Sequence, residues 1–194
     1  TQAPTNNDED STKNGFNFIG HSKGLNQYGY DNMSSLCGTV CPLYGIAENV
    51  ASDKMSQVTM QHLSSVIALK VTNTIDAPLV IETASFTAPE DIVGSYYISF
   101  AGEPAYTPRG EANVKNTAVV NVSNGTELAK NQSAVLYLAI KPFTAKSGDK
   151  LYISVNGYEK ELPLTKDVTF TAGKIKTVNF AYDYVKPSKE VVFD

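Results

Sequence analysis

The chain has no tryptophan, and Arg109 is its only arginine among 194 residues. Nucleic-acid binding needs a stripe of basic side chains, and none is visible in a chain with a formal net charge of −4. No run of about 18 apolar residues occurs, so a membrane-spanning helix is not expected. The G-x-x-x-x-G-K-[ST] and G-x-G-x-x-G phosphate loops are missing, and so is the G-x-S-x-G nucleophile elbow. We therefore name no catalytic, cofactor-binding or metal residues, and predict a protein that is not an enzyme, uses no cofactor and binds no nucleic acid.

The residues that are abundant favour strands. The chain has 11 Tyr and 8 Phe besides many Val and Thr, and aromatic and β-branched side chains are enriched in sheets. Charged residues make up 19%, which is typical of a folded domain and not of a disordered chain. All-β domains reach this length as one unit, so a single domain with a sizeable core is expected.

The strongest strand pattern lies near the end of the chain. Leu151, Ile153 and Val155 alternate with polar residues, as in a half-buried strand. The following Asn156-Gly157 favours positive φ at both positions of a tight hairpin turn. Residues 158–164 are then the antiparallel return strand.

Period-2 alternation predicts further strands along the chain, with residues 79–87 as the partner of 66–71. The closing segment is expected to hold three antiparallel strands in sequence. Seven to nine strands without a convincing amphipathic helix predict an all-β fold, an antiparallel two-sheet sandwich. The side chains expected in its core are Ile67, Leu69, Val71, Leu136, Leu138, Ile140, Val178 and Phe180.

Four segments, taken in order, carry a resemblance to a known family. They are Pro42-Leu43-Tyr44-Gly45, His62–Val66, Leu136–Pro142 and the closing segment Leu151–Phe180, with its NGY turn and its K-x-L-x-L, F-x-A-G-K and V-N-F motifs. Together they resemble a fimbrillin-type domain, of a family of surface lipoproteins and pilus subunits of Gram-negative anaerobes. The resemblance covers roughly residues 40 to 183.

The resemblance implies a Greek-key, transthyretin-like sandwich on the outer-membrane surface, acting as a pilus (fimbrial) subunit or accessory adhesin. Its partners would be other pilus or surface subunits joined by β-strand addition, and a host protein or glycan. Membrane attachment would come only through a lipid-anchored Cys upstream of Thr1. In polymerising members of the family, the chain is cut after a basic residue and an N-terminal strand is removed. This opens a groove, which a C-terminal segment then fills. This chain departs from that pattern, because it has no Arg near its start, where Lys13 is the first basic residue, and because the domain-closing motif lies near its end. A stable monomeric lipoprotein domain, or an isolated N-terminal domain, is therefore an equal expectation.

The chain is expected to divide into three parts. Residues 1–14 are a flexible tether, residues 15–183 a single β-sandwich domain, and residues 184–194 a linker or the start of a further segment. Aromatic-bearing pieces within Gly15–Gly45 are expected to occupy a sheet edge. The candidates for strand exchange are three apolar residues after a Pro-Lys linker: Val191, Val192 and Phe193.

Cys37 and Cys41 form a C-x3-C pair. A disulfide between them is the preferred interpretation for an exported chain. Two free thiols remain an alternative. A metal site is another, although it would need ligands as distant as His21 or His62.

A carbohydrate-binding module is the alternative function. Tyrosines on outer faces and in loops could stack on sugars, and Tyr97, Tyr106 and Tyr152 are the candidates.

Overall fold

A computed structural model gives the fold, and it describes residues 15–19, 24–36, 40–47, 57–100 and 103–185. Within these residues the regular structure consists of strands β1 to β16 and two 3-10 turns, η1 (Ser34–Leu36) and η2 (Glu111–Asn113). The prediction of an all-β fold is confirmed.

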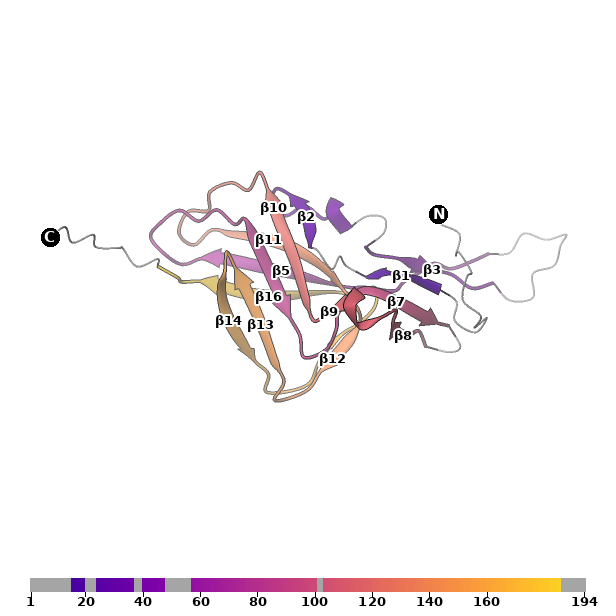
Figure 1. The fold of residues 1–194 in the computed structure, drawn as a ribbon. Coiled ribbons are helices and arrows are strands. Elements are labelled where there is room, and N and C mark those ends of the chain that lie inside the picture. The colour runs from indigo at the N-terminus through magenta and orange to yellow at the C-terminus, as the bar shows by residue number, and fades with distance from the viewer. Residues whose placement is uncertain (1–14, 20–23, 37–39, 48–56, 101–102, 186–194) are drawn as a thin grey trace.

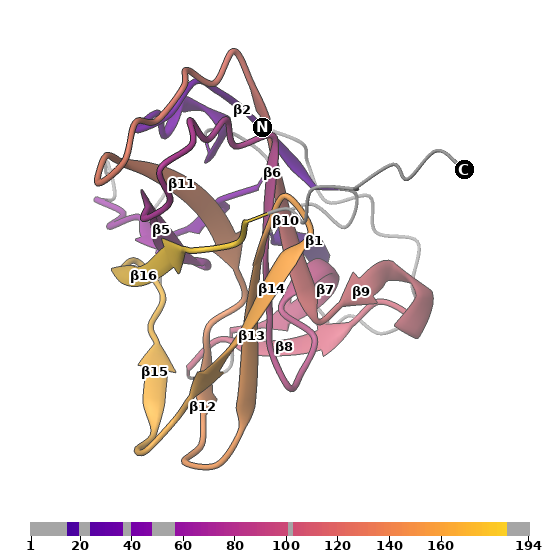
Figure 2. The ribbon, with the colours of Figure 1, turned by 90° about the vertical axis from the view of Figure 1, so that its left-hand side faces the viewer.

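Two sheets lie on either side of the main core, and Figure 2 shows them as two layers. The five-stranded sheet has the order β14 (Tyr158–Pro163), β13 (Lys150–Val155), β6 (Thr83–Thr87), β10 (Thr117–Ser123), β2 (Leu25–Tyr28). The three-stranded sheet has the order β11 (Ser133–Ile140), β5 (Ser65–Asn73), β16 (Ile175–Tyr182).

Three smaller sheets extend this body, as Figure 1 shows. One joins β1 (Gly15–Ile19), β7 (Val93–Ser99), β8 (Ala105–Pro108) and β9 (Val114–Lys115). The other two are pairs: β12 (Phe143–Ala145) with β15 (Val168–Phe170), and β3 (Leu43–Tyr44) with β4 (Gln61–His62).

The main core is built from the inward-facing residues of both large sheets. Leu69 and Leu136 of the three-stranded sheet are fully buried in one cluster with Phe86 and Ile153 of the five-stranded sheet. Of the eight predicted core residues, all are buried except Val178, which is half-buried. Period-2 alternation therefore identified the buried faces correctly. A second, smaller cluster lies under the four-stranded sheet and contains Ile19, Leu63, Tyr96, Ile98 and Val114.

Strand pairing differs from the prediction in two ways. The segment predicted as the partner of residues 66–71 contributes β6 to the opposite sheet, where it pairs with β10 and β13. The closing segment does not form three adjacent antiparallel strands, because β15 pairs with β12 and β16 enters the other sheet, parallel to β5. β2 also runs parallel to its neighbour, β10. Alternation fixes which face of a strand is buried, whereas the partner depends on where the connecting turn carries the chain.

The expectation of seven to nine strands was too low. The additional strands are short pieces at the margins, such as β3, β4 and β9, which have two residues each. Pieces of this length leave no periodic signal in a sequence.

The predicted hairpin turn is confirmed. Asn156 and Gly157 have φ values of 50° and 82°, as a primed turn requires. The Asn156 side chain also ties the turn to the segment before β6: its Oδ1 accepts hydrogen bonds from the backbone N–H of Glu82 and Thr83, and its Nδ2 donates to the Val80 carbonyl.

One open side of the two-layered body is closed by β2. Gln27 is completely buried there, and its Oε1 accepts a hydrogen bond from Tyr137 N–H at 2.9 Å while its Nε2 donates to the Val135 carbonyl at 3.2 Å. Asp31 completes the contact, because its Oδ1 accepts from Val135 N–H at 3.0 Å. The Asp31 backbone N–H also donates to the Val135 carbonyl at 3.0 Å. The middle of the outer edge of β11, at Val135 and Tyr137, is thus bonded to the β2 segment and not to a paired strand.

We predict that Gln27→Leu lowers the free energy of unfolding by about 1–3 kcal/mol, because it leaves the Tyr137 N–H buried without an acceptor. Urea unfolding followed by circular dichroism measures this. The control is Asn26→Ala at the neighbouring exposed position of β2, which should stay within about 0.5 kcal/mol of the parent. Equal effects of the two substitutions would show that Gln27 does not close this edge.

Candidate functional site

The feature that stands out in this fold is the outer edge of β16. Val66 N–H donates to the Lys174 carbonyl and Thr74 N–H to the Tyr182 carbonyl, so the even-numbered residues of β16 bond to β5. In a strand the next residue points its backbone groups to the opposite side. The odd-numbered residues therefore direct their N–H and C=O groups to the outer edge: Ile175, Thr177, Asn179 and Ala181.

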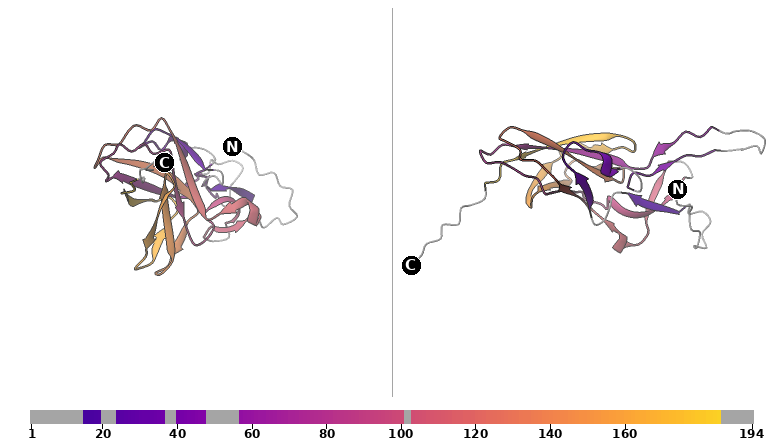
Figure 3. Two further views of the ribbon diagram at one scale, coloured as in Figure 1. Left: turned by 60° about the vertical axis from the view of Figure 1, so that its left-hand side comes forward. Right: turned by 90° about the horizontal axis from the view of Figure 1, so that it is seen from above.

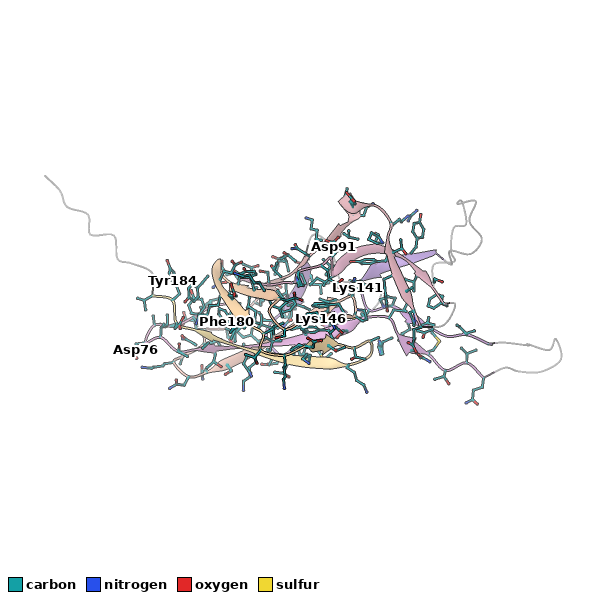
Figure 4. The ribbon with its side chains drawn as sticks, turned by 90° about the horizontal axis from the view of Figure 1, so that it is seen from below. Asp76, Asp91, Lys141, Lys146, Phe180 and Tyr184 are labelled. Carbon is teal, nitrogen blue, oxygen red and sulfur yellow. The ribbon has the colours of Figure 1, made fainter. Side chains whose placement is uncertain are left out.

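The far end of this edge is closed by β14. Lys160 Nζ donates to the Ala181 carbonyl at 2.8 Å and forms an ion pair with Asp183 at 2.7 Å. Tyr158 OH donates to Asp183 Oδ1 at 2.9 Å, and its ring stacks on Tyr184 with centroids 4.9 Å apart. Tyr184 lies where the described chain leaves the sheets (Figure 4). We call the group of Tyr158, Lys160, Asp183 and Tyr184 the exit clamp.

Contacts within the exit clamp shift the pKa values of Asp183 and Tyr158. The hydrogen bonds from Lys160 and then Tyr158 lower the pKa of Asp183 below its ordinary value. The same carboxylate raises the pKa of Tyr158. Ionised Asp183 and protonated Tyr158 are therefore the forms that hold the clamp together.

The near end of the edge is open. Thr177 and Asn179 are exposed, and the Ile175 side chain is 55% exposed. In the described part of the chain, no strand pairs with this side of β16. Unpaired N–H and C=O groups in a row are a template for another strand, so residues 175–179 form the candidate site.

An apolar hollow of about 460 Å³ lies beside this open edge. Its apolar lining includes Met33, Leu36, Leu43, Val66 and Ile175. Lys174 and His62, which is exposed on β4, also line it.

Two pieces of the N-terminal part occupy other sheet edges, as the sequence predicted. β1 is the outer strand of the four-stranded sheet, and β2 is the outer strand of the five-stranded sheet. Gly24 and Gly29 flank β2 with φ values of +91° and +69°, which only glycine adopts readily.

Some predicted site residues fall outside the described part of the chain. Cys37 does, and so do Val191, Val192 and Phe193. Cys41 is described, half-buried, and lines the hollow. The predicted Cys37–Cys41 bond and the strand-exchange role therefore stay predictions.

One sign of the hollow was overlooked in the sequence. Because Val178, Phe180 and Tyr182 face inward, alternation places Ile175 on the outer face, where its exposed side chain borders the hollow. Lys160 and Gln27 carried no comparable sign, because their roles depend on contacts across the two sheets.

Comparison with known proteins gives little. No family model matches the chain, and no curated protein matches it. A crystal structure of a candidate cell adhesion protein from Bacteroides uniformis aligns with 64% of this chain at 18% identity and a TM-score of 0.35. The alignment covers 48% of that protein, so this chain spans about half of its length. A TM-score of 0.35 is too low to establish a shared fold. In the described residues, no helix has the length and apolar character needed to cross a bilayer.

We predict that the exit clamp contributes stability that acid removes. Because the folded pKa of Asp183 is lowered, the contribution is complete above the ordinary aspartate pKa of about 3.9 and is lost as the pH falls through the lower folded value. The stability of Asp183→Asn should therefore fall less steeply than that of the parent as the pH is lowered. Both partners are partly exposed, so the loss at neutral pH should be under about 1 kcal/mol.

Thermal unfolding at a series of pH values below neutrality measures this difference. The control is Asp76→Asn, at an ion pair with Lys130 of the same 2.7 Å length whose carboxylate is 90% exposed. The clamp is refuted as a source of acid sensitivity if Asp183→Asn follows the same pH curve as the parent.

Proposed function

We propose that this chain is a non-enzymatic cell-surface adhesion domain of the fimbrillin kind, a pilus subunit or accessory protein that assembles by β-strand addition. The observation that carries the proposal is the open edge of β16 from Ile175 to Asn179. The ordered motifs that resemble fimbrillin-type domains support the surface location and the adhesive role.

Strand addition fits this edge energetically. Three outward residues offer one N–H and one C=O each, so an added strand gains about six ladder bonds, each worth a net 0.5–1.5 kcal/mol or so. Fixing the backbone of the incoming segment costs about 1–2 kcal/mol per residue. Durable assembly thus needs apolar side chains on the incoming strand as well.

The chain contains a segment with that composition. Val191-Val192-Phe193 lies between Glu190 and Asp194, after a Pro-Lys linker. Burial of such side chains is worth on the order of 1.5–3 kcal/mol each. We propose that this segment of one molecule pairs with the open edge of the next, and that β1, the outer strand of the four-stranded sheet, is the strand displaced when a second acceptor edge is needed.

The carbohydrate-binding alternative has less support. Tyr106 OH donates to the Leu63 carbonyl at 2.7 Å, and its ring packs edge-on against Tyr96. Burial raises the pKa of Tyr106 to about 12. The Arg109 guanidinium lies over the ring of Tyr97, 5.7 Å from its centroid. Two of the three candidate tyrosines are therefore engaged within the protein.

We predict that Thr177→Pro abolishes assembly without unfolding the domain. The Thr177 N–H points away from β5, and proline is tolerated on an edge strand when the missing N–H faces solvent. The matched control is Thr177→Val, which keeps the N–H and should assemble like the parent. Light scattering gives the size of the assembly, and circular dichroism confirms the fold.

Changing the incoming strand should have the same effect. Deletion of residues 185–194, or serine at all three positions of Val191-Val192-Phe193, should also abolish the larger assembly that forms by strand addition. A protein whose assembly size does not change when these residues are lost, before and after removal of its N-terminal segment, would refute strand addition and leave a stand-alone adhesin.

A further inference from the structure

A second apolar feature lies next to the hollow. The β3–β4 pair continues into a projection whose two limbs leave the body side by side, at residues 43–47 and 57–62 (Figure 3). A side chain at Gly45 would lie within contact of Val58 and Met60, so the limbs are close-packed against each other. We call these described residues the arm.

The arm carries aliphatic side chains in water. Met60 is 56% exposed, and Ile46 and Val58 are also exposed. Single exposed aliphatic residues are common, but several on one short projection mark an interaction surface.

The hollow has the complementary character. Met33, Leu43 and Ile175 line it and are themselves among the large exposed apolar residues. The chain thus carries apolar side chains that nothing in the described structure covers, and beside them an apolar hollow that no described side chain fills.

The arm cannot fill the hollow of its own molecule. Leu43 and His62 both line the hollow and pair with each other at the base of the arm. Tyr44, the next residue, stacks on Phe100 with centroids 4.7 Å apart, and its OH bonds to Gln61 Oε1 at 3.0 Å. These contacts direct the arm away from the hollow, and folding it back would break them.

We propose that the arm of one copy of this chain docks in the hollow of a second copy, with the reverse contact made at the same time. A two-fold axis makes such an interface self-complementary, because each copy supplies the same arm and the same hollow. Met60 of one protomer then lies against Ile175 of its partner. Both apolar surfaces are removed from water in one step, which provides the driving force for association. This dimer shares Ile175 with the open edge, through its side chain and not its backbone groups, but it does not use the Val191-Val192-Phe193 segment.

A charge-swap experiment tests the contact. Sedimentation velocity over a concentration series should show a dimer for the parent protein. Met60→Lys alone and Ile175→Glu alone should each weaken it by at least about tenfold, or about 1.4 kcal/mol, because each leaves one charge in an apolar contact. The double variant Met60→Lys/Ile175→Glu should recover dimerisation, because each lysine meets the partner's glutamate.

The control is Val80→Lys, at a side chain that is 38% exposed and lines neither the arm nor the hollow. It should dimerise like the parent. Deletion of residues 185–194 should also leave the dimer intact, which separates this contact from strand addition. A parent protein that is monomeric throughout the series, or a double variant no better than the single ones, would overturn the proposal.

Discussion

The structure depends on how the outer edges of its small three-stranded sheet are treated. A sheet of three strands has two edges close to its centre, and every edge residue that points outward carries an N–H and a C=O that need partners. At β11 the N–H and C=O of Val135 and the N–H of Tyr137 are bonded to Gln27 and Asp31 from the β2 segment. At β16 only the end near Ala181 is bonded, through Lys160. The two edges of one sheet are therefore unequal, and the difference lies in side chains contributed by the opposite layer.

This inequality connects the fold to the proposed function. The closed β11 edge and the exit clamp hold the two layers together on opposite sides of a shared core. Residues 175–179 can then remain open without exposing that core, because Phe180 and Tyr182 beyond them are buried. A rigid body with a short open edge is what strand addition requires, since the acceptor does not have to be ordered when the incoming segment pairs with it.

Much of the body could be predicted from alternation alone. The hairpin at Asn156-Gly157 and the buried faces of β5 and β11 follow from local sequence, because side-chain period and turn chemistry act over a few residues. The parallel pairing of β16 with β5 could not be predicted, since it depends on contacts between segments about a hundred residues apart. The roles of Gln27 and Lys160 were hidden because each bonds to the backbone of a strand that is not its neighbour in the chain, 110 and 21 residues away.

Backbone amide hydrogen exchange along β16 tests the central claim most directly, because the two sides of this strand alternate residue by residue. In the isolated protein, the amides of Thr177 and Asn179 should exchange rapidly, while that of Val178, which faces β5, should be protected. In the assembled form, the amides of Thr177 and Asn179 should become protected as well. Protection of Thr177 and Asn179 in the isolated protein, or rapid exchange of both in the assembled form, would contradict the assignment of this edge as the site of strand addition.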